Sequence, residues 1–151
     1  MAVVDTNVIV HGRGEIDFEE VYLTPEVIEE VESSHGRNII RNLEYTISRP
    51  ESDSVEKVRQ KSEELNSPTS EVDEELLALA LDLDEFIVTD DKALQNLALH
   101  LGVEFRGFHD PVLEEKFRWV KKCSNCGRKI SSPPCPRCGS PQVRRKQVRC
   151  S

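Results

Sequence analysis

Apolar and polar residues alternate along the first hundred positions in a pattern that predicts strands and helices in turn. Four short apolar runs predict strands. They are AVVDTNVIV at 2–10, interpreted as a buried strand that runs into a loop, VYL at 21–23, EFIVT at 85–89 and VEF at 103–105. The residues NSPTS at 66–70 are typical of a loop.

Helical spacing of apolar residues marks the segments between these strands. Helices are expected at 24–34, 37–46, 53–66, 71–84 and 91–102. Thr24 can cap the first helix, and Pro25 suits the first helical position. The clearest pattern is EVDEELLALALDLD, with an apolar stripe at Val72, Leu76, Leu79 and Leu83. Strands that alternate with helices predict an α/β fold with a parallel sheet covered on both faces.

Length and composition indicate one ordinary domain with a small additional module. The chain has 151 residues, of which 37% are hydrophobic and 32% are charged. No apolar run reaches the roughly 18 residues that indicate a membrane span. The N-terminus begins directly with strand-like sequence, so we expect no targeting peptide and a cytoplasmic location.

The net charge of −8 hides an uneven distribution of charge. Eleven Lys and Arg residues and no acidic residue occur from Lys116 onward, whereas 28 acidic and nine basic residues precede it. An acidic body with a basic tail indicates that one end binds nucleic acid. An intramolecular charge match or a solvated tail is the alternative explanation.

Five cysteines lie in the last 29 residues, and four of them have the spacing of a metal site. The pattern is C-x2-C, eight residues, then C-x2-C, at Cys123, Cys126, Cys135 and Cys138. Four thiolates predict a tetrahedral, structural zinc site, with a labile disulfide pair or an iron centre as alternatives. The fifth, Cys150, is expected to be a free thiol. Basic residues around the site are expected to bind RNA: Lys121, Lys122, Arg128, Lys129, Arg137, Arg144, Arg145 and Lys146.

Acidic residues recur at the ends of the predicted strands and on the faces of helices. Asp5 interrupts the first apolar run, and Asp90 and Asp91 follow the strand at 85–89. Glu30 flanks the apolar face of its helix, and Asp73 opens the Leu-rich helix. Ligands of open parallel sheets bind beyond the carboxyl ends of the strands. If these acids converge, their repulsion requires a hard cation such as Mg²⁺ or Mn²⁺, which can activate water for phosphoryl transfer.

Each acid also has a structural explanation. Asp73 could form a capping box with Ser70, and Asp90 could cap the helix that begins near Lys92. Glu30 could be solvated, and Asp5 could accept hydrogen bonds from backbone amides. Other enzyme classes fit less well, because the chain has no phosphate-binding glycine loop and no nucleophile paired with a histidine.

Four segments together resemble the motifs of PIN domains. In chain order they are VVDTNVIV, LTPEVIEEV, SEVDEELLALAL and FIVTDDKALQNLA. With the cysteine pattern that follows, the chain resembles the archaeal PIN-plus-zinc-ribbon endoribonucleases of the Nob type, which mature the 3′ end of small-subunit rRNA. The resemblance implies a PIN-like three-layer domain with a mostly parallel central sheet, followed by a small rubredoxin-like zinc ribbon. The implied divisions are 1–107 for the nuclease, 108–120 for a connector and 121–151 for the ribbon.

The resemblance also implies a reaction and the residues that perform it. It implies metal-dependent cleavage of single-stranded precursor rRNA that leaves a 3′-hydroxyl and a 5′-phosphate, with the pre-ribosomal particle as partner. Asp5, Glu30, Asp73 and Asp91 match the four acids that hold Mg²⁺ or Mn²⁺, and Asp90 is a further candidate. A non-catalytic RNA-binding assembly factor and a PIN ribonuclease that acts on another RNA are the alternatives.

Overall fold

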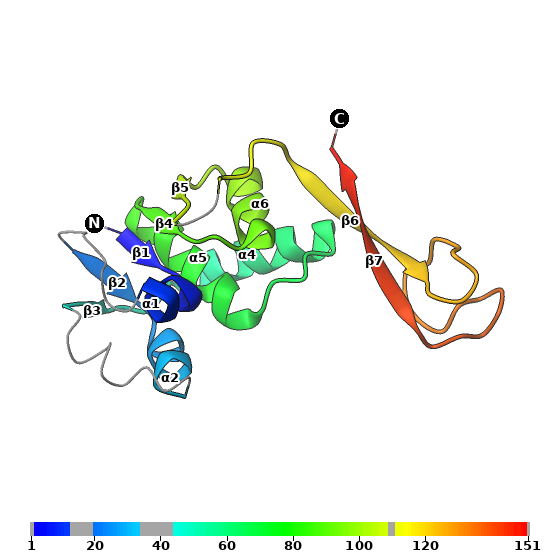
Figure 1. Ribbon diagram of the computed structural model, residues 1–151, viewed down its shortest axis with the longest axis horizontal. Coiled ribbons are helices and arrows are strands. Elements are labelled where there is room, and N and C mark those ends of the chain that lie inside the picture. Colours follow the sequence, from blue (N-terminus) through cyan, green and yellow to red (C-terminus); the bar gives the residue numbers. More distant parts are fainter. Residues whose placement is uncertain (1, 13–19, 34–43, 109–110, 151) are drawn as a thin grey trace.

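A five-stranded parallel sheet forms the centre of the molecule, with strand order β3-β2-β1-β4-β5 (Figure 1). The computed structural model describes residues 2–12, 20–33, 44–108 and 111–150. Every strand pair in this sheet is parallel. The strands are β1 (Ala2–Val4), β2 (Val21–Leu23), β3 (Thr46–Ile47), β4 (Phe86–Val88) and β5 (Phe105–Arg106).

The central strands are buried on both faces, as their continuous apolar sequences predict. In β1, Val3 lies opposite Tyr22 on one side and Ile87 on the other. Both Val3 and Ile87 are fully buried. The strands predicted at 21–23, 85–89 and 103–105 are confirmed, with β5 beginning two residues later than expected.

Two groups of helices cover the sheet. They are α1 (Thr6–Gly12) with α2 (Pro25–Ser33), and α4 (Ser52–Leu65) with α5 (Glu71–Leu83) and α6 (Lys92–Leu101). Because strand order changes direction after β3, right-handed crossovers place the two groups on opposite faces. The result is the three-layer arrangement that the sequence predicted. None of the described helices is long and apolar enough to cross a membrane.

Local sequence chemistry explains where the helices begin and end. Ser70 accepts a hydrogen bond from the Asp73 amide at the start of α5, and Gly102 ends α6 with a φ of 72°. The left-handed backbone at Gly102 favours glycine, as expected at this position. The segments predicted at 53–66, 71–84 and 91–102 are helical with small changes at their ends.

One prediction for the first segment is wrong. The run at 2–10 was expected to continue from its strand into a loop, but the residues after Asp5 form the short helix α1. Val8 and Ile9 bury their side chains in the core, which outweighs the β-propensity of this Val- and Ile-rich run. The helix predicted at 37–46 lies mostly outside the described residues, and its last residue, Thr46, belongs to β3.

A long antiparallel hairpin follows the sheet and extends away from it (Figure 1). Its strands are β6 (Phe117–Cys123) and β7 (Val143–Arg149), paired from Phe117 opposite Arg149 to Cys123 opposite Val143. The strand β6 begins inside the segment that was predicted to be a connector. Trp119 of β6 is half-buried and packs against the core of the α/β body.

Candidate active site and metal centre

The strand order reverses between β1 and β4, and the candidate site lies at the carboxyl ends of these two neighbours. The Asp5 amide donates to the Val88 carbonyl over 3.0 Å, so the chain leaves both strands at the same place. Asp5 directly follows β1, and Thr89, Asp90 and Asp91 follow β4. Such a switch point is where open parallel sheets bind ligands.

Asp5 is a buried carboxylate, with only 2% of the residue exposed. The Thr89 hydroxyl donates to its Oδ2 over 2.8 Å. Burial, together with the charges of Asp73 and Asp91, raises the pKa of Asp5 to about 7 against the opposing hydrogen bond from Thr89. Asp5 is therefore near the midpoint of its titration at neutral pH.

Asp73 lies in the first turn of α5 and combines a structural role with a place near Asp5. Its carboxylate accepts hydrogen bonds from the Ser70 hydroxyl and amide, which completes the predicted capping box. Burial raises the pKa of Asp73, and the charges of Asp91 and Glu30 contribute to the rise. Asp73 therefore both caps α5 and lies close enough to the other acids to feel their charge.

Glu30 approaches the site from α2. The Thr6 hydroxyl donates to Glu30 Oε2 over 2.9 Å, and Thr6 is the residue directly after Asp5. Glu30 and Thr6 line an open pocket of about 470 Å³ together with Asn7, Glu26, Glu29, Ser33 and Val72. Of the predicted acids only Glu30 lines this pocket, but Thr6 and Val72, which also line it, are the chain neighbours of Asp5 and Asp73.

Asp91 and Asp90 differ in their contacts. The Asp91 carboxylate accepts from the Ala93 amide over 2.9 Å and caps α6, so the prediction that Asp90 is the cap is wrong. The Asp90 carboxylate accepts instead from the Phe108 amide over 2.7 Å. The charge of Asp91 contributes to the raised pKa values of Asp5 and Asp73. Asp91 therefore joins the acidic group, and Asp90 braces the segment after β5.

The acidic group has the character of a site for a hard divalent cation. In the described part of the chain, no Lys or Arg forms an ion pair with Asp5, Asp73 or Asp91. Their mutual repulsion is thus left for a bound cation to relieve. Within the same residues, no three of these carboxylates bring their oxygens within 4.8 Å of one another. An ion bound here would therefore have to keep several of its waters as ligands.

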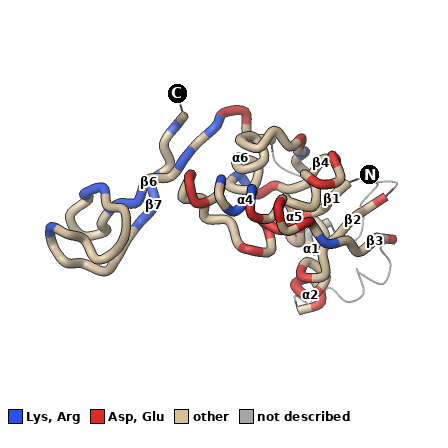
Figure 2. Tube along the Cα trace, turned by 180° about the vertical axis from the view of Figure 1, so that it is seen from behind, with Lys and Arg blue, Asp and Glu red and all other residues tan. Residues whose placement is uncertain are grey.

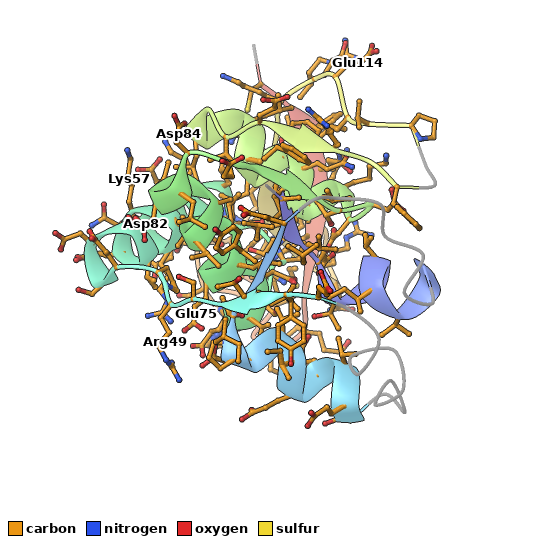
Figure 3. All side chains as sticks on the ribbon, turned by 90° about the vertical axis from the view of Figure 1, so that its left-hand side faces the viewer. Arg49, Lys57, Glu75, Asp82, Asp84 and Glu114 are labelled. Atoms are coloured by element: carbon orange, nitrogen blue, oxygen red, sulfur yellow. The ribbon has the colours of Figure 1, made fainter. Side chains whose placement is uncertain are left out.

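A second pocket, of about 480 Å³, adjoins the first at Glu26 but differs in its electrostatics. There Arg49 pairs with Glu26 at 3.4 Å, and Arg59 pairs with Glu75 at 3.6 Å. Figure 3 shows Arg49 and Glu75 on this outer side of the body. Two of its three acids, Glu26 and Glu75, already have cationic partners, so this pocket is a weaker candidate for a metal ion.

The four predicted zinc ligands meet at the end of the hairpin. All four Sγ atoms lie within 4.8 Å of one another, with Cys123 and Cys138 at 3.4 Å and Cys126 and Cys135 at 3.7 Å. A tetrahedral zinc ion with Zn–S bonds of about 2.3 Å needs sulfurs roughly 3.8 Å apart. The spacing fits zinc, and none of the five cysteines forms a disulfide. Cys150 lies outside the group, as predicted.

The two cysteine pairs have the same backbone design. The amides of Gly127 and Gly139 donate to the carbonyls of Cys123 and Cys135, and both glycines have a φ near 75°. Backbone amides also point at the sulfurs. The Cys126 amide holds the pKa of Cys123 down to about 6, and the Cys138 amide lowers the pKa of Cys135. These thiols are thereby prepared to bind a metal as thiolates.

The predicted RNA-binding residues line the hairpin and its loops (Figure 2). Strand alternation places Lys122, Arg144 and Lys146 on one face, and Lys129 bridges to Lys122 from the loop. The charges of Lys146, Lys129 and Arg144 lower the pKa of Lys122. Lys121 and Arg145 form a pair on the opposite face, and Arg128 and Arg137 are exposed beside the cysteines. The first face is a concentrated cationic surface.

Thr89 was not predicted as a site residue, although it makes the contact that holds Asp5. Its only signal in the sequence is its place between a buried strand and two aspartates. Gln95 and Asn96 were not predicted either, because amides inside a helical repeat are usually solvated. Both are buried.

Comparison with known proteins agrees with this geometry. Residues 2–83 match the family described as the PIN domain of ribonuclease. The chain is 34% identical over 138 residues to Endoribonuclease Nob1 of Archaeoglobus fulgidus, covering 85% of this chain and 82% of the relative. It is 35% identical over 157 residues to Endoribonuclease Nob1 of Methanocaldococcus jannaschii, covering 97% and 78%.

A solved structure supports the fold. The crystal structure of FitAcB from Neisseria gonorrhoeae superposes with a TM-score of 0.50 at 17% identity, covering 70% of this chain and 96% of that chain. The match lies below the identity at which function can be compared, so it concerns the fold alone. With the family match and the relatives above, it leads to one conclusion: this chain belongs to the Nob1 family of PIN-domain endoribonucleases.

Proposed function

We propose that this chain is a metal-dependent endoribonuclease that cleaves single-stranded precursor rRNA at the 3′ end of small-subunit rRNA. The observation that carries the proposal is the convergence of Asp5, Asp73 and Asp91 at the switch point, with Glu30 acting on Asp73. The names of the relatives support the reaction class. A basic hairpin attached to an acidic body supports a polyanionic substrate.

The proposed catalytic ion is Mg²⁺ or Mn²⁺, held by Asp5, Glu30, Asp73 and Asp91. These are hard oxygen ligands, and their net negative charge suits a divalent cation. When bound, such an ion lowers the pKa of a water molecule and stabilises the charge that develops on the phosphate. Cleavage is proposed to leave a 3′-hydroxyl and a 5′-phosphate.

The protein residues set the geometry of the reaction. Thr89 holds Asp5, Thr6 holds Glu30, and the start of α5 holds Asp73. Each proposed ligand therefore has a hydrogen-bond partner that fixes its direction, as metal ligands commonly do. Asp90 is the remaining candidate, and because its carboxylate accepts from the Phe108 amide, its proposed role is to support the loop.

The hairpin is proposed to supply the affinity for RNA that the acidic body lacks. We propose that residues 1–107 form the nuclease domain, that 108–120 connect, and that 121–151 form the zinc ribbon. Phosphate contacts position a protein on nucleic acid without reading bases. The substrate would thus be selected by the context of the pre-ribosomal particle.

Cleavage of a short RNA that spans the rRNA 3′ end, in the presence of Mn²⁺, tests the proposal. Asp5→Asn should lower the rate constant by roughly a thousandfold, the upper range for removal of one transition-state stabilising group. Asp53→Asn, at an exposed residue of α4, is the matched control and should cleave normally.

Two outcomes would contradict the proposal. Cleavage that survives Asp5→Asn would remove Asp5 from the mechanism. Tight RNA binding by the wild-type protein without any cleavage would favour the alternative of a non-catalytic assembly factor.

A further inference from the structure

Two neighbouring amides on α6, Gln95 and Asn96, are buried and fully hydrogen-bonded. Gln95 is 0% exposed and Asn96 is 1% exposed. A buried side-chain amide is costly unless both its donor and its acceptor find partners. Both do so here, and all the partners are backbone groups on two different segments of the chain.

Gln95 joins the active site to the connector. Its Nε2 donates to the Thr89 carbonyl over 2.7 Å, and its Oε1 accepts from the Leu113 amide over 2.9 Å. One partner is a carbonyl and the other is an amide, so the orientation of the side chain is determined. Gln95 thus spans the distance between the end of β4 and the segment that leads to β6.

Thr89 is the residue through which Gln95 reaches the acids. The Thr89 hydroxyl donates to Asp5 and also accepts from the Asp91 amide over 3.1 Å. The Thr89 amide donates to the Arg106 carbonyl of β5 over 3.0 Å. With its carbonyl bound by Gln95, every polar group of Thr89 is engaged. Among the described residues, the bond from Gln95 is the one hydrogen bond of Thr89 that comes from outside the sheet and the acidic group.

Asn96 attaches the first residue of the hairpin in a similar way. Its Oδ1 accepts from the Phe117 amide over 2.6 Å, and its Nδ2 donates to the Phe117 carbonyl over 2.9 Å. His100 lies 3.0 Å from the same carbonyl. The side chain of Asn96 therefore pairs with Phe117 much as a neighbouring strand would, and its hydrogen bonds do not involve Thr89.

We propose that Gln95 is a positioning residue of the nuclease, which orients Asp5 through Thr89 and couples the site to the connector through Leu113. The proposal rests on the proposed function, because it assumes that Asp5 binds a divalent ion. In this arrangement the docked connector is part of the support of the active site. Asn96 and His100 hold the connector near by but do not orient Asp5.

A double-mutant cycle on Mn²⁺ affinity, measured by calorimetry on the full-length zinc-loaded protein, tests this role. Gln95→Met should raise the Kd for Mn²⁺ by about tenfold, the lower range for a lost partner behind a metal ligand. Thr89→Val should weaken binding at least as much. If Gln95 acts through Thr89, the double variant should bind Mn²⁺ within about twofold of Thr89→Val.

Two further variants separate positioning from general damage. Asn96→Leu should leave Mn²⁺ affinity unchanged, and Gln60→Met, at an exposed residue of α4, is the matched control. In RNA cleavage, Gln95→Met should lower kcat and leave the KM for RNA unchanged. Effects of Gln95→Met and Thr89→Val that multiply would overturn the proposal, as would a loss of Mn²⁺ affinity in Asn96→Leu equal to that in Gln95→Met.

A measurement on the wild-type protein removes any dependence on the folding of a variant. Saturation with Mg²⁺ should slow hydrogen exchange of the Leu113 amide, because coupling between two sites is reciprocal. An unchanged rate at Leu113 would overturn the proposal while leaving the nuclease function intact. If the wild-type protein binds no divalent ion at its acids, the proposed function itself is wrong.

Discussion

The α/β body and the zinc hairpin are opposite in charge, and they differ in what stabilises their folded structure. Residues before Lys116 include 28 acidic and nine basic side chains, a net charge of −19, whereas the residues from Lys116 onward carry +11 (Figure 2). The body buries a continuous apolar core across its sheet and helices. Among the described residues of the hairpin, only Cys123 and Cys135 are buried.

In the proposed function, cutting RNA and holding RNA require different surfaces. The acids that would bind a catalytic cation repel an RNA backbone, so the body alone is a poor RNA-binding surface. The hairpin has no acidic residue and can approach phosphates, but it has no group that could hydrolyse them. An acidic surface for a metal ion and a basic surface for phosphates cannot occupy the same place. The fold puts them on the body and on the hairpin, which hydrogen bonds from Asn96 of α6 to Phe117 hold together.

Removal of zinc should have the largest effect, because it should unfold the hairpin and leave the α/β body folded. A zinc-selective chelator should abolish the hydrogen-exchange protection of β6 and β7, because structural zinc contributes about 10 kcal/mol or more to folding. The body should keep its protection, since its core does not depend on the metal. Cys138→Ser should have the same effect as the chelator, and Cys150→Ser should have none. Unfolding of the whole chain together would contradict this separation.

The free energy of unfolding of the α/β body should depend on pH, because two of its acids have raised pKa values. In metal-free conditions, native Asp5 keeps its proton up to about pH 7, whereas an unfolded aspartate loses it near pH 3.8. The native state therefore binds more protons between these values, and the free energy of unfolding falls as pH rises through this window. Asp73, whose pKa is also raised, acts in the same direction.

Urea unfolding of the chelated protein at several pH values measures this effect. Asp5→Asn should flatten the dependence and stabilise the protein at pH 7.5, whereas Asp53→Asn should leave the dependence unchanged. A divalent ion should reverse the trend, because deprotonation of Asp5 favours its binding. Stability that rises between pH 4 and pH 7 without metal would contradict the assignment of a raised pKa to Asp5.

The smallest expected effect concerns single cations of the hairpin. Lys122→Gln should weaken binding of an rRNA-derived stem-loop to a similar degree for unrelated sequences, and should reduce the slope of log K against log salt by about 1. Lys57→Gln removes a lysine of α4 from the outer side of the body and serves as the control (Figure 3). An equal loss in both variants would show that total charge, rather than the hairpin, determines binding.

Much of the fold could be predicted because buried strands and helices need apolar residues at particular positions in the sequence. The Leu-rich α5 repeat has a helical period, and the short β-branched apolar run of β4 is bounded by polar residues, as is typical of a buried strand. The helix at 6–12 could not be predicted, because Val8, Ile9 and Val10 favour strands locally and only their packing in the core makes them helical. The start of β6 was missed for a related reason: its register is set by contacts with β7 and α6.

The sequence predicted the acids of the candidate site but not the residues that hydrogen-bond to them or to their neighbours. Asp5 stood out as a charge inside an apolar run, and the cysteines stood out by spacing. Asp90 and Asp91 are neighbours with the same chemistry, so only the φ and ψ angles at the start of α6 could decide which of them is the cap. Thr89 and Gln95 act through tertiary hydrogen bonds that leave no periodic signal in the sequence.

The most direct test of the central claim is a Mg²⁺ titration monitored at the side-chain carboxyl carbons by NMR. The signals of Asp5, Glu30, Asp73 and Asp91 should move together with a single Kd, while the signal of Asp53 stays in place. Four separate midpoints, or shifts no larger than that of Asp53, would show that these carboxylates do not bind one ion in common.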